Sequence, residues 1–120
     1  MSSPAGGALA PGTGVDAAAL PLAHEPLPTE EVRDGAPTAA SVVLAALGDT
    51  EIGVWEMTPG TASDTEADEV FVVLSGRASI AFDDPDLPDL EVGAGSVVRL
   101  ADGQRTVWTV SETLRKIYIA

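Results

Sequence analysis

The chain has 120 residues, a length that fits one domain built on a single hydrophobic core. Its formal net charge of -13, from 19 acidic and 6 basic residues, would repel the phosphate backbone of nucleic acids and the anionic surface of a membrane, so neither is expected as a partner. The absence of cysteine excludes disulfide bonds, zinc–thiolate sites and a cysteine nucleophile.

Residues 1–25 are rich in alanine, glycine and proline and contain no aromatic residue. The prolines interrupt this segment too often for a long helix, so we expect an irregular arm that is flexible, loosely docked, or packed across a partner subunit. The N-terminus shows no basic stretch followed by an apolar one, and the chain has no run of the ~18 apolar residues that span a bilayer. We therefore expect a soluble, cytoplasmic protein whose folded domain covers residues 26–120.

From about residue 39 onward, the sequence consists of short apolar or alternating runs separated by residues that favour turns. This pattern is typical of an all-β sandwich or a small barrel. Glycine, proline and aspartate supply the separators, among them residues 58–68, which are expected to form a loop. The eight predicted strands cover residues 40–47, 51–57, 69–74, 77–82, 89–92, 96–100, 105–110 and 114–119.

Ser75 and Gly76 separate two of these runs and predict a tight hairpin, because glycine readily adopts the positive φ that such a turn needs. The two flanking strands would then be antiparallel neighbours. Residues 83–90 contain four aspartates and two prolines. We interpret them as a solvated loop, because the prolines and the missing glycine do not fit a calcium-binding loop.

The spacing of a glutamate and several glycines gives the first indication of a family. Glu69 precedes Gly76 by seven residues, and Gly95 is followed by Gly103 at a spacing of eight. These two groups resemble the two sequence motifs of the cupin superfamily, in which histidines and a glutamate bind a metal ion. The positions that match the family's histidines hold Ser63, Thr65 and Thr106.

Flanking segments narrow the resemblance. GVWEM before the first motif, a tryptophan after the second and RKIY near residue 118 are similar to small single-domain cupins of the ureidoglycine aminohydrolase cupin-domain family, over residues 37–120. The resemblance implies a cupin-type jelly-roll β-barrel and commonly a homodimer. It also implies metal chemistry at histidines, yet the single histidine of the chain is His24, in the arm. We therefore predict no metal ion and no other cofactor.

Side chains alternate across a strand, so the motif position of Glu69 predicts which side chains face the barrel interior. The same reasoning applies to Thr106 in the second motif. The residues placed on the predicted inward faces are Trp55, Met57, Glu69, Phe71, Val73, Thr106, Trp108, Val110, Lys116 and Tyr118.

An ionised Glu69 inside an apolar barrel is unfavourable unless a cation or hydrogen-bond donors compensate its charge. Lys116 is the predicted counter-charge, with the Tyr118 hydroxyl and the Trp108 indole N–H as donors. We predict catalytic roles for Glu69, Lys116 and Tyr118. The predicted ligand-binding residues are Trp55, Met57, Phe71, Thr106 and Trp108.

Other interpretations of these residues remain open. Counted forward from Gly60, Glu66 and Asp68 fall at the offsets of the family's first two histidines, and with Glu69 they could bind a hard ion such as Mg²⁺. His24 could act as an acid or base if the arm folded over the barrel mouth, although a histidine in such an arm is more often exposed. Glu69 could also lie at the barrel mouth without a function, and the two tryptophans could belong to the core alone.

The predicted function is the binding of a small polar metabolite in the barrel cavity. The candidate reaction is a metal-independent hydrolysis or proton transfer at a polarised C–N or C=O bond. One alternative is a non-catalytic scaffold that binds a protein partner, and another is a carboxylate–metal enzyme similar to ureidoglycine aminohydrolase. Cupins host many unrelated functions, so the fold alone does not choose among these.

Overall fold

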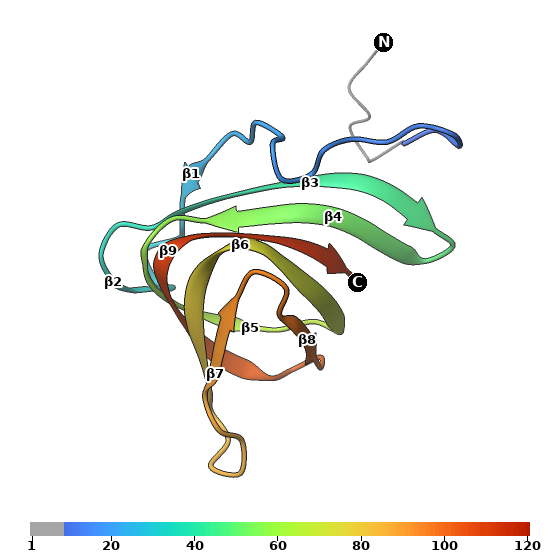
Figure 1. Ribbon diagram of the computed structural model, residues 1–120. Coiled ribbons are helices and arrows are strands. Elements are labelled where there is room, and N and C mark those ends of the chain that lie inside the picture. The colour runs from blue at the N-terminus through green and yellow to red at the C-terminus, as the bar shows by residue number, and fades with distance from the viewer. Residues whose placement is uncertain (1–8) are drawn as a thin grey trace.

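The computed structural model describes residues 9–120, which form nine β-strands. The strands make one curled antiparallel sheet that wraps around a core (Figure 1), which confirms the predicted all-β jelly-roll β-barrel. Over residues 9–120 there is no helix long and apolar enough to cross a membrane. The strands are β1 (Glu25–Pro26), β2 (Val32–Asp34), β3 (Thr38–Leu47), β4 (Thr50–Met57), β5 (Gly60–Thr65), β6 (Glu69–Phe82), β7 (Leu90–Gly93), β8 (Val97–Leu100) and β9 (Arg105–Ile119).

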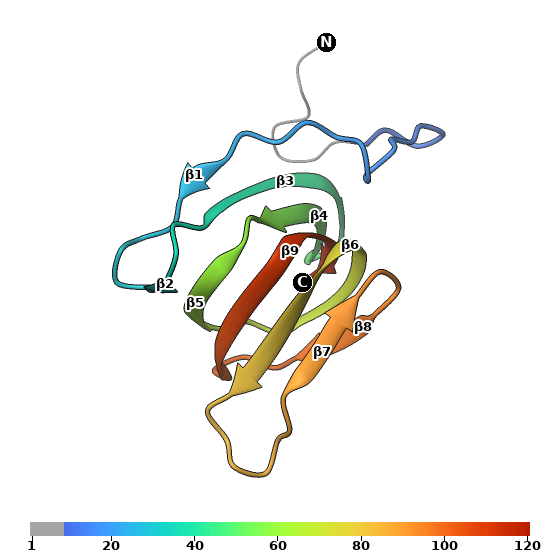
Figure 2. The same cartoon turned by 60° about the vertical axis from the view of Figure 1, so that its left-hand side comes forward.

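Two long strands, β6 and β9, hold the barrel together. They pair with each other from Val70 opposite Ile119 to Phe82 opposite Thr106. On its other edge β9 pairs first with β5 and then with β4, while β6 pairs first with β8 and then with β7. Because each long strand has two successive neighbours, the sheet curls around the interior (Figure 2).

The hairpin predicted at Ser75 and Gly76 is wrong, because both residues lie inside the continuous strand β6. The runs at residues 105–110 and 114–119 are likewise parts of one strand, β9. Gly76 has a φ of 92°, and the pairing with β9 shifts register on both sides of it, which marks a β-bulge. A Cβ at this position would collide with the carbonyl oxygen of Thr113, so the bulge requires glycine.

The prediction that residues 58–68 form a loop is wrong in part, because they contain strand β5. Its sequence GTASDT shows no apolar alternation, yet it pairs with β9 from Gly60 opposite Val110 to Thr65 opposite Arg105. It also pairs with β2 on its other edge. The neighbouring strands therefore fix this polar segment in the wall of the barrel.

The core follows the predicted alternation. On β9, Thr106, Trp108 and Val110 are buried while the residues between them are more exposed. Phe71 and Val73 are buried in the same way on β6. The largest fully buried side chains are those of Phe71, Met57, Ile80, Leu100, Leu114, Val54 and Val73.

Residues 9–24 run along the outer side of the sheet, near β3 (Figures 1 and 2). The amide of Leu9 donates to the carbonyl of Leu44, and the guanidinium of Arg115 donates to the carbonyls of Ala17 and Leu20. This part of the predicted arm is therefore docked on the barrel, whereas residues 1–8 of it lie outside the described residues. The division of the chain at residue 25 stays a prediction.

Candidate functional site

A cavity of about 320 Å³ opens inside the barrel between β4, β5, β6 and β9. Six of the eight predicted site residues line it. Phe71 is fully buried behind this wall, and Thr106 is buried beside it. The roles of all eight in binding or catalysis stay predictions. The six that line the cavity are Trp55, Met57, Glu69, Trp108, Lys116 and Tyr118.

A buried ion pair joins the first residue of β6 to the last part of β9. Lys116 Nζ donates to Glu69 Oε2 at 2.6 Å, and the two side chains are only 7% and 15% exposed. The same Nζ lies 4.3 Å from the ring centroid of Phe71, 4.8 Å from that of Trp55 and 4.9 Å from that of Trp108. The carboxylate and the ring faces both attract the ammonium. The prediction that Lys116 is the counter-charge of Glu69 is therefore confirmed.

A second carboxylate, Glu66, lies deeper in the wall and was not predicted as part of a metal-free site. It is 7% exposed and accepts hydrogen bonds from Thr106 Oγ1 at 2.6 Å and from Trp108 Nε1 at 3.0 Å. The prediction that Trp108 donates to Glu69 is therefore wrong. The sequence held one signal for Glu66, its spacing from Gly60, which matches a ligand position of the cupin motif.

Tyr118 also binds a different carboxylate from the one predicted. Its hydroxyl donates to Glu51 Oε2 at 2.8 Å and not to Glu69. Burial, together with the hydrogen bond to Glu51 and the negative charges of Glu51 and Glu69, raises the pKa of Tyr118 to about 12. Gly53 makes room for the tyrosine, because a Cβ there would lie 2.5 Å from the ring. The phenol is therefore a hydrogen-bond donor at neutral pH.

The three carboxylates that could have formed a metal site are held apart by different partners. Asp68 is exposed and pairs with Arg99 Nη2 at 3.2 Å, whereas Glu66 and Glu69 bind the buried donors described above. Across residues 9–120, no group of three or more histidine, cysteine, aspartate or glutamate side chains is placed to hold a metal ion. The carboxylate cluster considered from the sequence is therefore not formed.

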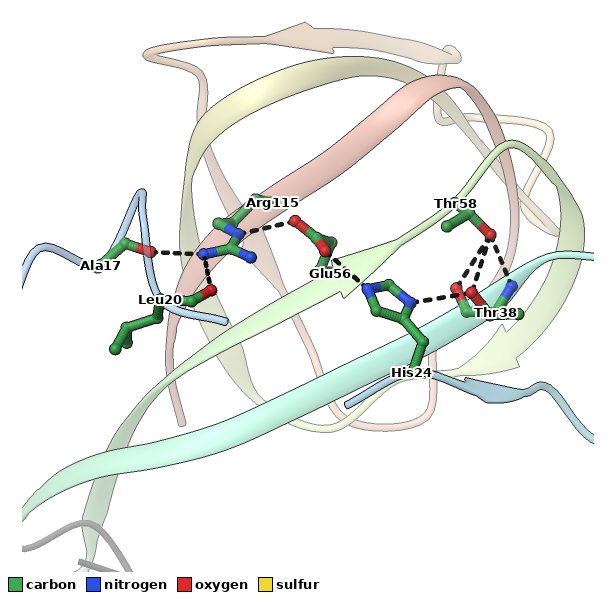
Figure 3. A network of polar contacts seen from close by, with 7 residues as sticks. All are labelled: Ala17, Leu20, His24, Thr38, Glu56, Thr58 and Arg115. Carbon is green, nitrogen blue, oxygen red and sulfur yellow. Dashed lines mark hydrogen bonds and ion pairs between the residues drawn. The ribbon is translucent and has the colours of Figure 1, made fainter. Parts of the chain in front are cut away.

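Figure 3 shows another polar network, on the opposite face of β4 and β9 from the cavity. Glu56 accepts from Arg115 Nε at 2.7 Å, and His24 Nε2 lies 2.7 Å from its other oxygen. His24 Nδ1 lies 2.9 Å from Thr38 Oγ1. Burial acts to raise the pKa of Glu56, but the contacts with Arg115 and His24 outweigh it and lower this pKa below 4.5. His24 therefore fixes the arm to the outer face, and the alternative that it serves as an acid or base at the barrel mouth is wrong.

A larger groove of about 620 Å³ is lined by residues of β5 and of the ends of β6 and β9, and it shares Glu31, Ser63 and Asp64 with the cavity. Its charged residues are exposed or half-buried, and Thr106 is the one buried polar residue along it. Two buried charged residues, Glu66 and Lys116, line the smaller cavity instead, while the buried Arg115 belongs to the network on the outer face. We therefore take the cavity as the candidate site.

Comparisons with known proteins agree with this fold. The sequence model of the EutQ-like cupin domain matches residues 44–118. A protein of unknown function from Rhizobium leguminosarum bv. viciae 3841 is 26% identical with a TM-score of 0.60, over 68% of this chain and 78% of that one. Another protein of unknown function, from Pseudomonas syringae pv. tomato, is also 26% identical, with a TM-score of 0.72 over 88% of this chain and 46% of that one.

The EutQ protein of Clostridium difficile is 22% identical, with a TM-score of 0.61 over 78% of this chain and 73% of that one. At this identity the similarity shows the fold alone. No curated protein matches the chain. These findings support the cupin superfamily, but they do not show the narrower ureidoglycine aminohydrolase family predicted from the sequence. Because the matched pattern covers more than half of the sequence, the chain belongs to the family of EutQ-like cupin domains.

Proposed function

We propose that this cupin binds a small polar molecule in its barrel cavity, and that the ion pair of Glu69 and Lys116 is the main polar group that contacts it. The pair itself is the observation that supports the proposal, since both side chains are largely buried and both line the cavity. Small-molecule sites are commonly cavities of about 300–1,000 Å³ with aromatic walls and a few polar groups. The cavity of this barrel lies at the lower end of that range.

The energetics of a buried ion pair favour a role in binding over a role in stability. Removing two charges from water is unfavourable, and their mutual attraction often fails to offset this. Apolar side chains of similar volume could fill the same space beside Trp55 and Phe71. A pair that adds little to folding but faces a cavity is better explained by contact with a ligand.

The same groups suit a metal-independent proton transfer or hydrolysis. Glu69 would act as the acid or base, and the Lys116 ammonium would stabilise negative charge that develops on a substrate oxygen. Tyr118, kept protonated by its raised pKa, would donate a hydrogen bond at the rim. The resemblance to ureidoglycine aminohydrolase cupins supports a substrate with a polarised C–N bond.

A double variant, Glu69→Leu with Lys116→Met, tests the binding proposal. We expect it to fold with an equal or higher Tm, because apolar residues replace the pair, and to lose the ligands that wild type binds in a fluorescence and NMR screen of small polar metabolites. Arg77→Met with Glu112→Leu is the matched control, because it removes an exposed ion pair whose side chains are 73% and 66% exposed. Unchanged ligand binding by the cavity variant would contradict the proposal.

A single Glu69→Gln variant separates an enzyme from a non-catalytic binding protein. If a ligand found in the screen is turned over by wild type, the variant should keep its fold and lose turnover, because an amide cannot transfer the proton. A scaffold would keep its affinity for a protein partner in the same variant.

We also propose that the protein is a cytoplasmic homodimer that binds neither nucleic acid nor membranes. Its net charge of -13 supports the absence of polyanionic partners. Sedimentation velocity and cell fractionation would test the oligomeric state and the location.

A further inference from the structure

Carboxylates outnumber cations around the cavity. Five acidic residues line it against one lysine, so the excess is four negative charges when all are ionised, since five minus one is four. Lys116 is already paired with Glu69, and the other acidic residues have no basic partner among the residues that line the cavity. The five acidic residues are Glu31, Glu51, Asp64, Glu66 and Glu69.

Glu66 presents an unsatisfied acceptor to this space. Both of its protein donors, Thr106 and Trp108, bind the same oxygen, Oε2. No described residue donates to Oε1, and no fully buried side-chain oxygen of residues 9–120 lacks a partner, so Oε1 keeps some contact with solvent, and Glu66 is among the residues that line the cavity. A carboxylate in so buried a residue is unfavourable without donors, and a ligand N–H would supply one.

Asp64 adds a second acceptor on the same side. Its pKa is raised to about 6, first by loss of water contact and then by the negative charges of Glu66 and Glu31, which outweigh the lowering effects of the Thr65 amide and the Lys116 charge. The carboxylate of Asp64 is therefore close enough to be repelled by those of Glu66 and Glu31. A positive ligand group between them would relieve that repulsion.

A positive ligand group is not expected to bind over Trp55 and Trp108, because Lys116 already occupies that position. The rings of Trp55 and Trp108 lie 5.7 Å apart between centroids, and the Lys116 ammonium already lies over both of them. A second cation beside this ammonium would be repelled. The carboxylates of Glu66 and Asp64 are left as the attractive position.

We propose that the cavity selects small organic cations with N–H donors, such as ammonium or amidinium groups, and that the charged group binds between Glu66 and Asp64. The inference rests on the proposed ligand-binding function of the cavity and names the chemical class of its ligand. The rest of such a molecule would extend toward Lys116 and the tryptophans.

Three probes of nearly equal shape test the class: butylamine as the cation, butyramide as the neutral amide and butyrate as the anion. Both tryptophans of the protein line the cavity, so intrinsic fluorescence reports binding there. At neutral pH we expect butylamine to bind at least about tenfold more tightly than butyrate, as one charge-assisted hydrogen bond suffices for that difference.

Variants of Glu66 and Asp64 test where the charged group of the ligand binds. Glu66→Gln keeps an oxygen for Thr106 and Trp108 but turns an amide NH₂ toward the cavity, so butylamine should bind at least about tenfold more weakly while butyramide changes by less than about twofold. Asp64→Asn, at an exposed position, should weaken butylamine binding without disturbing the fold. Glu91→Gln makes the same chemical change at an exposed residue outside the cavity and should bind all three probes like wild type.

The outcomes separate the two proposals. Butyrate binding as tightly as butylamine would overturn the cation class and would still support a ligand-binding cavity. Unchanged butylamine affinity in both Glu66→Gln and Asp64→Asn would overturn the assigned position. A fluorescence response to none of the three probes would overturn both the cation class and the proposed binding function.

Discussion

The pKa of Asp64 makes the stability of the protein depend on pH in a way that can be measured. Although Asp64 is exposed as a whole residue, its carboxyl has lost part of its water contact, and mainly for this reason its pKa rises from 3.8 to about 6. The folded protein therefore holds this proton more tightly than the unfolded chain does. The contribution of Asp64 to the free energy of unfolding is therefore greatest below pH 3.8, and it is lost as the pH rises from 3.8 to about 6.

Asp64→Asn should abolish this pH dependence, since asparagine does not ionise. We expect the free energy of unfolding of the variant, relative to wild type, to be higher at about pH 7.5 than at about pH 5. Urea unfolding at the two pH values measures the difference. Asp89→Asn, in the exposed loop between β6 and β7, is the control that changes the same charge. A variant-to-wild-type difference that is equal at both pH values would count against a raised pKa at Asp64.

The carboxylates of Glu69 and Glu66 differ in how far the sequence could predict their surroundings. Lys116 and Glu69 follow from strand alternation and from the need of a buried charge for a counter-charge. The donors to Glu66 lie 40 and 42 residues away, on β9, and the segment around Glu66 is mostly polar. Apart from its spacing from Gly60, nothing in the local sequence distinguishes this glutamate from one in a solvated loop, because its donors come near it only when β5 pairs with β9.

At the scale of elements, the sequence predicts where strands occur better than how they join. The glycine at position 76 does adopt a positive φ, as a hairpin requires, but a bulge within a strand requires it equally. The choice between the two depends on β9, which pairs with β6 on both sides of Gly76. Pairing between strands that lie so far apart in the sequence cannot be predicted from any short segment of it.

The docked arm is the element whose attachment can be tested directly. Arg115→Met removes the guanidinium that binds Glu56 and the carbonyls of Ala17 and Leu20. Breaking a buried pair by removing one partner lowers the free energy of unfolding by about 3 kcal/mol, and we expect a loss of that order. Amide exchange of residues 9–24 should also become faster.

Arg77→Met is the matched control for this variant, because it removes an exposed arginine whose pair with Glu112 is worth less than about 1 kcal/mol. Exchange rates of the arm that stay equal in Arg115→Met and wild type would show that other contacts hold it. Hydrogen exchange measured by mass spectrometry resolves the two cases, since the arm and the barrel give separate peptides.

At the scale of the whole molecule, the distribution of charge is uneven. Of the six basic residues, Arg115 and Lys116 belong to buried ion pairs. Two others, Arg77 and Arg99, form exposed ion pairs with acidic residues of the surface. The net charge of -13 therefore resides mainly in surface carboxylates, which repel one another and favour expansion of the chain.

Added salt should stabilise this protein. Raising NaCl from about 0.02 M to about 0.2 M shortens the screening length to less than about 10 Å and weakens repulsion between surface carboxylates, while the buried pairs are screened much less. We expect a gain on the order of 1 kcal/mol, or about 4 °C in Tm for a domain of this size, measured by circular dichroism at constant pH. The same step in Asp89→Asn, which carries one negative charge fewer, should give a slightly smaller rise. A Tm that falls with salt would mean that the exposed ion pairs outweigh the repulsion, because screening weakens those pairs as well.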